Sequence, residues 1–269
     1  MYENGNRYVG EWKKNERTGS GILYYKNGNK YEGNWLDDKE QGNGILLYND
    51  GEKYEGEWNE GKICGKGIFY FKNNSRYEGI FQCDERNGHG IYYYENGDRY
   101  EGNWKDDLRH GIGTLYYTEG GRYEGGWIDD YKSGIGTFYY ANGDKYEGEW
   151  LGDYMNGKGT YFHNNGDKYK GMWKDSMKEG RGTLKFRNGN IYKGQWKSDN
   201  YNGRGTFYYN NGHIYVGEWL NDLKHGKGVY YYSDNTKFIG EWINGAKHLG
   251  KFYKKTINDT WIEDKLRTE

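Results

Sequence analysis

The chain has 269 residues, of which 46 are glycine, 32 are tyrosine and none is proline, and its 39 basic and 40 acidic residues give a formal net charge of −1. This balance argues against general nucleic-acid binding, and the lack of a long apolar run argues against a membrane span. Two cysteines are too few for a disulfide framework, so a reduced cytoplasmic setting is the simplest interpretation. Aromatic residues make up 19% of the chain, so the core is predicted to consist mainly of aromatic rings.

A tyrosine, a glycine and a tryptophan at Tyr8, Gly10 and Trp12 begin a phrase that returns every 23 residues without insertion. One clear copy reads NGDKYEGEW at 142–150, and a G-x-G pair follows the phrase on the same period. A fixed period of this length is typical of stacked repeat proteins, in which each repeat is one supersecondary unit. The chain is therefore predicted to contain eleven copies of one small unit.

Each copy is predicted to be a β-hairpin. A turn glycine such as Gly28 precedes the phrase, and only asparagine replaces it, at Asn74 and Asn235. Glycine and asparagine tolerate a left-handed backbone best, so this column is predicted to have positive φ. The run before the turn, 22–25, and the run after it, 30–35, are both typical of strands. Six-residue segments such as 36–41 are predicted to be linkers that return the chain to the next hairpin.

The turn type decides which side chains share a face of the hairpin. A two-residue turn would put Tyr24 opposite Tyr31, whereas a three-residue loop with a glycine bulge would put Leu23 there. Glu119 occupies the asparagine column in one repeat, and glutamate fits poorly where a two-residue turn needs positive φ. The bulged loop is therefore favoured, which places Leu23, Tyr31 and the tryptophans on one face and Tyr24 on the other.

The sequence YEGxW, followed by G-x-G and a turn glycine on a 23-residue period, resembles the MORN (membrane occupation and recognition nexus) repeat over residues 5 to about 253. The resemblance implies an all-β fold, an elongated, twisted antiparallel sheet of eleven stacked 23-residue β-hairpins. Residues 1–249 are predicted to form the array, and residues 250–269 either a degenerate closing repeat or a short capping helix.

The same resemblance implies a non-enzymatic scaffold or adaptor that binds protein partners along an extended aromatic sheet. It places the protein in a cytoskeletal or ciliary assembly, for example at the axoneme, and the alternative is a phosphoinositide-binding membrane adaptor. The first repeat begins midway through a strand, and an uncovered strand edge invites pairing with another chain. We therefore expect self-association or a larger complex.

The residues give no support for catalysis. The paired carboxylates Asp37-Asp38, Asp106-Asp107 and Asp129-Asp130 recur in one column, which favours a turn-forming role over acid–base chemistry. The histidines show no metal-ligand spacing, and the G-x-G pairs do not precede helices. We predict no catalytic residue, metal site, cofactor, small-molecule substrate or nucleic-acid partner.

Two sets of residues are candidates for partner contact. A tyrosine stripe on the face opposite the tryptophans would suit an extended peptide or a helix, since tyrosine is enriched at protein interfaces, although it could equally fill a two-sided sheet. A small basic cluster near the C-terminus is the candidate lipid contact. The stripe consists of Tyr24, Tyr70, Tyr93, Tyr116, Tyr139, Tyr208 and Tyr231, and the cluster of Lys247, Lys251, Lys254 and Lys255.

Overall fold

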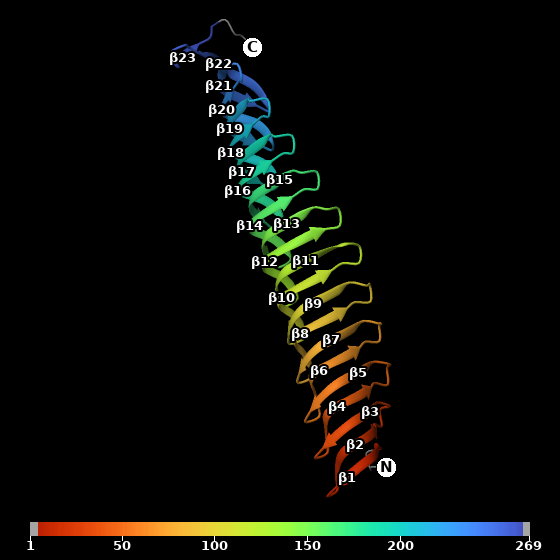
Figure 1. Cartoon of the computed structure of the whole chain (residues 1–269). Helices are drawn as coiled ribbons and strands as arrows, with labels where there is room; N and C mark the ends of the chain where they lie inside the picture. The colour runs from red at the N-terminus through yellow and green to blue at the C-terminus, as the bar shows by residue number, and fades with distance from the viewer. Residues whose placement is uncertain (1–4, 266–269) are drawn as a thin grey trace. The chain divides into compact units, whose positions relative to one another are not determined.

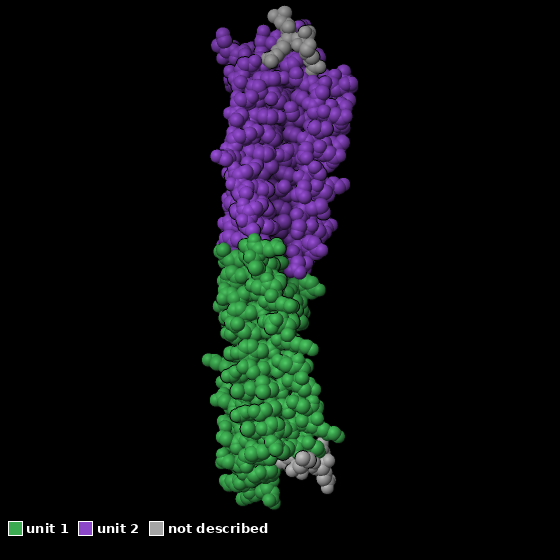
Figure 2. Space-filling view, turned by 90° about the vertical axis from the view of Figure 1, so that its right-hand side faces the viewer, with its two compact units in different colours: residues 1–134 green, residues 135–269 purple. Residues whose placement is uncertain are grey.

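A computed structural model describes residues 5–265, which form 23 strands and contain no helix (Figure 1). None of these residues therefore builds a helix that is long and apolar enough to cross a membrane. The chain divides into two compact units, unit 1 (residues 1–134) and unit 2 (residues 135–269), which Figure 2 colours separately. The boundary falls inside β12 (Tyr131–Tyr140).

In each unit the strands form an antiparallel meander, because each strand pairs with the next along the chain. The strands of unit 1 before β12 are β1 (Arg7–Lys13), β2 (Glu16–Tyr24), β3 (Lys30–Leu36), β4 (Lys39–Leu47), β5 (Lys53–Asn59), β6 (Lys62–Tyr70), β7 (Arg76–Gln82), β8 (Glu85–Tyr93), β9 (Arg99–Lys105), β10 (Leu108–Tyr116) and β11 (Gly121–Ile128). The strands of unit 2 after β12 are β13 (Lys145–Leu151), β14 (Tyr154–Phe162), β15 (Lys168–Lys174), β16 (Met177–Lys185), β17 (Ile191–Lys197), β18 (Asn200–Tyr208), β19 (Ile214–Leu220), β20 (Leu223–Tyr231), β21 (Thr236–Ile243), β22 (Ala246–Lys255) and β23 (Trp261–Glu263).

The predicted bulged hairpin is confirmed. Leu23 pairs with Tyr31 across β2 and β3. The N–H of Gly28 donates to the carbonyl of Tyr25 at 3.0 Å, and Gly28 has a φ of 92°. The positive φ is the reason that this column accepts only glycine and asparagine, whose short or absent side chains tolerate the left-handed region.

The predicted linkers are wrong, because these segments are strands joined by a two-residue turn. Leu36 pairs with Lys39 and Trp35 with Glu40, so β3 and β4 continue up to the turn. Asp37 and Asp38 form that turn with φ of 50° and 63°. Aspartate is one of the few non-glycine residues that enter the left-handed region, and a turn of this type matches the twist of the flanking strands. The sheet is thus a continuous meander within each unit rather than a set of separate hairpins.

At the C-terminal end, β22 and β23 form a hairpin through residues 256–260, in which Asp259 has a φ of 65°. Residues 250–265 contain no helix, so within them the segment follows the closing-hairpin alternative. Residues 266–269 lie outside the described part of the chain. So do residues 1–4, on which the expected uncovered edge partly depends.

The core of most repeats is one tyrosine that packs between two tryptophans, with Phe81 in place of one tryptophan and Phe238 in place of one tyrosine. Tyr31 is fully buried, and its ring makes edge-to-face contacts with Trp35 and Trp58 at centroid distances of 5.1 and 5.0 Å. Its hydroxyl donates to the carbonyl of Asn34 at 3.1 Å. Edge-to-face pairs contribute free energy beyond the area that they bury. Because the same arrangement recurs with the period, rings replace aliphatic side chains as the core of both units.

The glycine pairs allow these tyrosine rings to lie against the backbone. A Cβ at Gly44 would lie 2.3 Å from the hydroxyl oxygen of Tyr31, and the backbone of Gly44 does not have a positive φ. Gly44→Ala is therefore expected to lower the free energy of unfolding by roughly 1–3 kcal/mol, as overpacking does. The matched control is Gly51→Asn, where no atom lies within 4 Å and φ is 98°. It should cost less than about 1 kcal/mol, since asparagine tolerates this conformation. Equal losses in urea unfolding would contradict the steric explanation.

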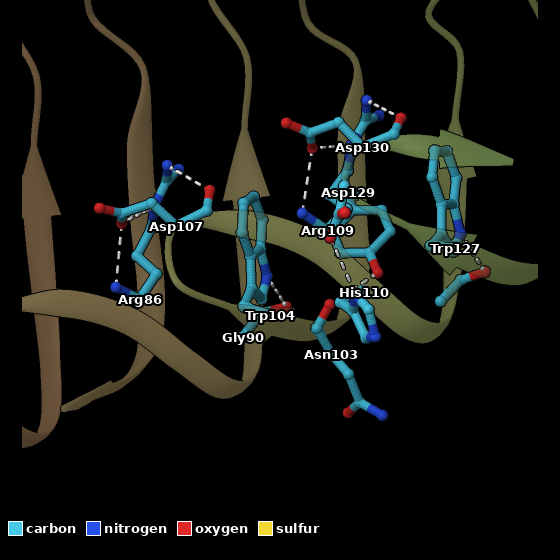
Figure 3. Close-up of polar contacts among 12 residues, drawn as sticks. Arg86, Gly90, Asn103, Trp104, Asp107, Arg109, His110, Trp127, Asp129 and Asp130 are labelled. Carbon is cyan, nitrogen blue, oxygen red and sulfur yellow. Dashed lines mark hydrogen bonds and ion pairs between the residues drawn. The ribbon is translucent and has the colours of Figure 1, made fainter. Parts of the chain in front are cut away.

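The paired carboxylates connect successive repeats (Figure 3). The Nε of Arg109 donates to the Oδ1 of Asp130 at 2.8 Å, and its Nη2 donates to the carbonyl of the same residue at 2.9 Å. The guanidinium also lies 4.4 Å from the ring centroid of Trp127. Arg86 repeats these bonds with Asp107 one repeat earlier. These aspartates therefore form turns and bind the neighbouring repeat.

Candidate partner-binding face

Side chains alternate between two faces of the sheet, as in any strand. One face, here called the aromatic face, carries Tyr31 and Trp35, which are 0% and 3% exposed. The opposite face, here called the open face, carries Tyr24, Lys30 and Glu32 and their counterparts in other repeats, and these side chains remain half-buried or exposed. The open face is therefore where partners can reach side chains in every repeat.

The predicted tyrosine stripe lies on the open face, beside the hairpin loops. Tyr208 is 36% exposed, and the other six tyrosines are half-buried. Cations from the paired strand cover several rings: Arg76 lies 3.9 Å from the centroid of Tyr93, and Lys53 lies 4.2 Å from that of Tyr70. Such cation–π contacts stabilise the sheet itself. The stripe therefore has a structural role, and partner contact through it stays a proposal.

In unit 1 the cations at this position of the repeat also form ion pairs on the open face. Lys30 Nζ lies 2.7 Å from Glu32 Oε2, and Arg76 Nε lies 2.7 Å from Glu78 Oε1. The hydrogen bond that Lys30 donates to Glu32 raises the pKa of Lys30. Charges in this part of the face therefore largely compensate one another.

The open face of unit 2 is hollowed into a groove of about 1250 Å³ that crosses β13 to β20. The backbone of paired glycines such as Gly182 and Gly194 lies along its floor, because their other side is covered by tyrosine rings of the aromatic face. Threonines and long charged side chains line the rest. The charged lining residues are Glu147, Lys158, Lys170, Arg181, Lys193, Arg204, Glu218 and Lys227.

Sequence reasoning missed this groove. The signal was present, because the column that holds glutamate from Glu32 to Glu147 changes to lysine at Lys170 and Lys193. A change of charge inside an otherwise regular column marks a position that the fold does not constrain.

The predicted basic cluster near the C-terminus is largely neutralised. Lys251, Lys254 and Lys255 lie 3.0, 3.9 and 2.6 Å from the carboxylates of Glu263, Asp264 and Asp259. The first of these bonds raises the pKa of Lys251.

The fourth lysine, Lys247, lies 5.0 Å from the ring centroid of Phe252. Lipid headgroups at this cluster would have to compete with three ion pairs.

The residues outside these surfaces offer little chemistry. In residues 5–265 no three histidine, cysteine or acidic side chains are grouped as metal ligands. Cys64 and Cys83 are free thiols, and the Sγ of Cys64 accepts a hydrogen bond from the N–H of Cys83 at 3.4 Å. His110, which Figure 3 shows beside the turn, contacts Asp129 at 3.3 Å. These side chains join neighbouring repeats.

Comparisons with known proteins identify the repeat. Eleven consecutive segments match the family described as MORN repeat: 8–30, 31–53, 54–76, 77–99, 100–122, 123–145, 146–168, 169–191, 192–214, 215–237 and 238–248. A comparison with curated proteins gave no match.

Solved structures give more distant similarities. The TCP10 domain of Danio rerio CPAP, solved in complex with a peptide of Danio rerio STIL, is 10% identical with a TM-score of 0.41, covering 91% of this chain and 98% of that one. The SAS-4 (dCPAP) TCP domain of Drosophila melanogaster, in complex with a Proline Rich Motif of Ana2 (dSTIL), is 13% identical with a TM-score of 0.34, covering 74% and 88%. The family assignment rests on the repeat itself.

Proposed function

This chain belongs to the MORN repeat family, and from that premise we propose that it is a non-enzymatic scaffold that binds protein partners on its open face. The observation that carries the proposal is the difference between the two faces. The aromatic face is filled by rings such as Tyr31 and Trp127, which are 0% and 2% exposed. The open face keeps long charged side chains accessible and, in unit 2, encloses a groove.

The repeat favours extended partners over small ones. Each repeat adds two strands, which is about 9.6 Å at the usual strand spacing. A partner that crosses several repeats gains contacts from each of them, and no single repeat has to supply a deep pocket. This is the advantage of a repeat array as a scaffold.

We place the scaffold in a cytoskeletal or ciliary assembly, and family membership is the support for this placement. Attachment to membranes through phosphoinositides is the weaker proposal, because the lysines at 251, 254 and 255 are already paired with carboxylates. Fluorescence microscopy of the tagged protein distinguishes the two locations. Staining of membranes that survives extraction of the cytoskeleton would reverse this order.

Site-specific photo-crosslinking tests the binding face. A photoreactive residue at Arg181, on the open face, is expected to form adducts with defined proteins in extract of the source cell. The matched control is the same residue at Asn188, an exposed position in the next hairpin loop. Mass spectrometry of the adducts provides the readout. Absence of protein adducts at Arg181, or equal labelling at both positions, would contradict binding on the open face.

A further inference from the structure

The groove of unit 2 carries an excess of positive charge that nearby carboxylates do not neutralise. Its lining contains six cations and two carboxylates. One of the carboxylates, Glu147, is held by Lys145. Within residues 5–265, none of the six cations has an ion-pair partner, although Lys193 lies 5.4 Å from the ring centroid of Tyr208. All six are exposed, and they are Lys158, Lys170, Arg181, Lys193, Arg204 and Lys227.

The repeat does not require these charges. In unit 1 the positions that correspond to Lys170 and Lys193 hold Val9 in the first repeat and glutamates in the next five, from Glu32 to Glu124. Each of these glutamates pairs with a cation two residues earlier, as Glu55 does with Lys53 at 3.1 Å. The positions that correspond to Arg181 include a serine, an asparagine and an isoleucine in unit 1. The same backbone thus forms with other charges, so the cations of unit 2 are in excess of what folding needs.

The excess has an energetic cost in the absence of a ligand. Cations in successive repeats lie about 9.6 Å apart along a row, from the usual strand spacing. This distance is close to the Debye length of about 8 Å at physiological ionic strength, so their repulsion is only partly screened. An anionic ligand in the groove would convert the repulsion into attraction. We infer that the groove binds an acidic segment of a partner protein in an extended conformation, and this inference rests on the proposed scaffold function.

The period of the repeat favours one peptide geometry. A polyproline II chain rises about 3.1 Å per residue, so every third residue advances about 9.3 Å. This nearly equals the advance of about 9.6 Å per repeat. A segment that lies across the strands with an aspartate or glutamate at every third position would therefore present one carboxylate to each repeat of the groove.

The floor of the groove suits a peptide backbone. Thr160, Thr183 and Thr206 line it where the first four repeats have isoleucines such as Ile45. Threonine hydroxyls can donate to the carbonyls or carboxylates of a bound chain. The residues between them are glycines such as Gly182, whose Cβ position lies on the aromatic face against Tyr169, so only their backbone faces the groove.

Other anionic ligands fit less well. The lining contains no aromatic side chain on which a nucleic-acid base could stack. The cations line a recess that crosses eight strands, and an extended chain can contact more of that length than a single lipid headgroup.

Fluorescence anisotropy with synthetic peptides tests the inference on the full chain. The probe is a labelled peptide of glutamate-proline-proline repeats, and its controls are a lysine-proline-proline peptide and a peptide of equal composition with the glutamates clustered. We expect binding of the first peptide alone, weakening as salt increases. Equal binding of the clustered peptide would overturn the spacing argument, and absence of binding would overturn the inference.

Charge reversal locates the site. The double variant Lys170→Glu, Lys193→Glu is expected to weaken binding of the acidic peptide at least tenfold, and it should fold because unit 1 carries glutamate in this column. The matched control, Lys174→Glu with Lys197→Glu, makes the same change of net charge outside the groove lining. An equal loss in both variants would show attraction by net charge alone and overturn the inference. Circular dichroism and thermal melting verify the fold of each variant.

Two further outcomes separate this inference from the proposed function. If the groove variant still forms protein adducts from a photoreactive residue at Arg181, the scaffold function stands and the acidic ligand is wrong. If the wild type binds phosphoinositide vesicles through Lys170 and Lys193 and ignores the acidic peptide, the groove is a lipid site and the inference is overturned.

Discussion

Raising the pH from 10 towards 12 is expected to unfold the protein steeply. Burial raises the pKa of the core tyrosine in eight repeats above the usual value of 10.0, and that of Tyr77 to about 12. The eight are Tyr31, Tyr54, Tyr77, Tyr100, Tyr146, Tyr169, Tyr192 and Tyr215. Each ring is fully buried, so the charged phenolate is strongly disfavoured there.

The direction follows from proton linkage. Below pH 10 both the folded and the unfolded chain keep the phenolic proton, and these tyrosines add no pH dependence. Above pH 10 the unfolded chain loses the proton while the folded chain keeps it, up to the raised pKa. The free energy of unfolding therefore falls by about 1.4 kcal/mol per pH unit for each buried tyrosine. Since all eight tyrosines contribute, their summed loss of unfolding free energy exceeds typical domain stabilities of about 5–15 kcal/mol within one to two pH units.

Phenylalanine in the same column provides the control. Phe238 occupies this position in the last matched repeat and is fully buried. The double variant Tyr77→Phe, Tyr100→Phe should move the alkaline midpoint to higher pH, even though each change removes a hydrogen bond to a backbone carbonyl worth about 1 kcal/mol. Far-UV circular dichroism and tyrosinate absorbance follow the transition. Complete ionisation near pH 10 with the strand signal intact would contradict the prediction.

The regular columns of the sequence predicted the hairpin correctly. The register could be inferred because Glu119 excludes a two-residue turn at the loop and because Leu23 belongs to an apolar column, and both constraints act within one repeat. The turn-forming role of Asp37 and Asp38 was predicted, but the length of the connection was not, because a polar segment such as 36–41 is compatible with a six-residue linker as well as with two strands joined by a two-residue turn. Only the pairing of Leu36 with Lys39 distinguishes them.

The groove could not be predicted in the same way, since the constant columns report what the fold needs. The fold does not require the charges that line the groove, so they vary between repeats, and the overall net charge of −1 conceals the local excess. The ion pairs of the lysine cluster near the C-terminus could not be predicted for a related reason. Its carboxylate partners Asp259, Glu263 and Asp264 come within reach only once the last hairpin has formed.

Trp127→Ala is expected to lower the free energy of unfolding by roughly 3–5 kcal/mol, as the loss of a buried aromatic side chain does. The ring is 2% exposed and makes edge-to-face contacts with Tyr100 and Tyr123, both at a centroid distance of 5.3 Å. Its Nε1 donates to the carbonyl of Gly113 at 3.1 Å, and the guanidinium of Arg109 covers one side of the ring. Alanine would leave a cavity and remove contacts to three strands together.

Two variants in the same column separate the contributions. Trp12→Ala removes a tryptophan that is 50% exposed, and it should cost about 1 kcal/mol because half of its surface already faces water. Trp127→Phe reproduces the natural Phe81, which keeps edge-to-face contacts with Tyr54 and Tyr77 at 5.3 and 5.1 Å. It should cost less than half as much as Trp127→Ala, because the ring contacts remain and only the hydrogen bond to Gly113 and some volume are lost. Urea unfolding followed by circular dichroism measures all three variants. A cost for Trp127→Ala no larger than that for Trp12→Ala would show that the tryptophan column does not stabilise the stack.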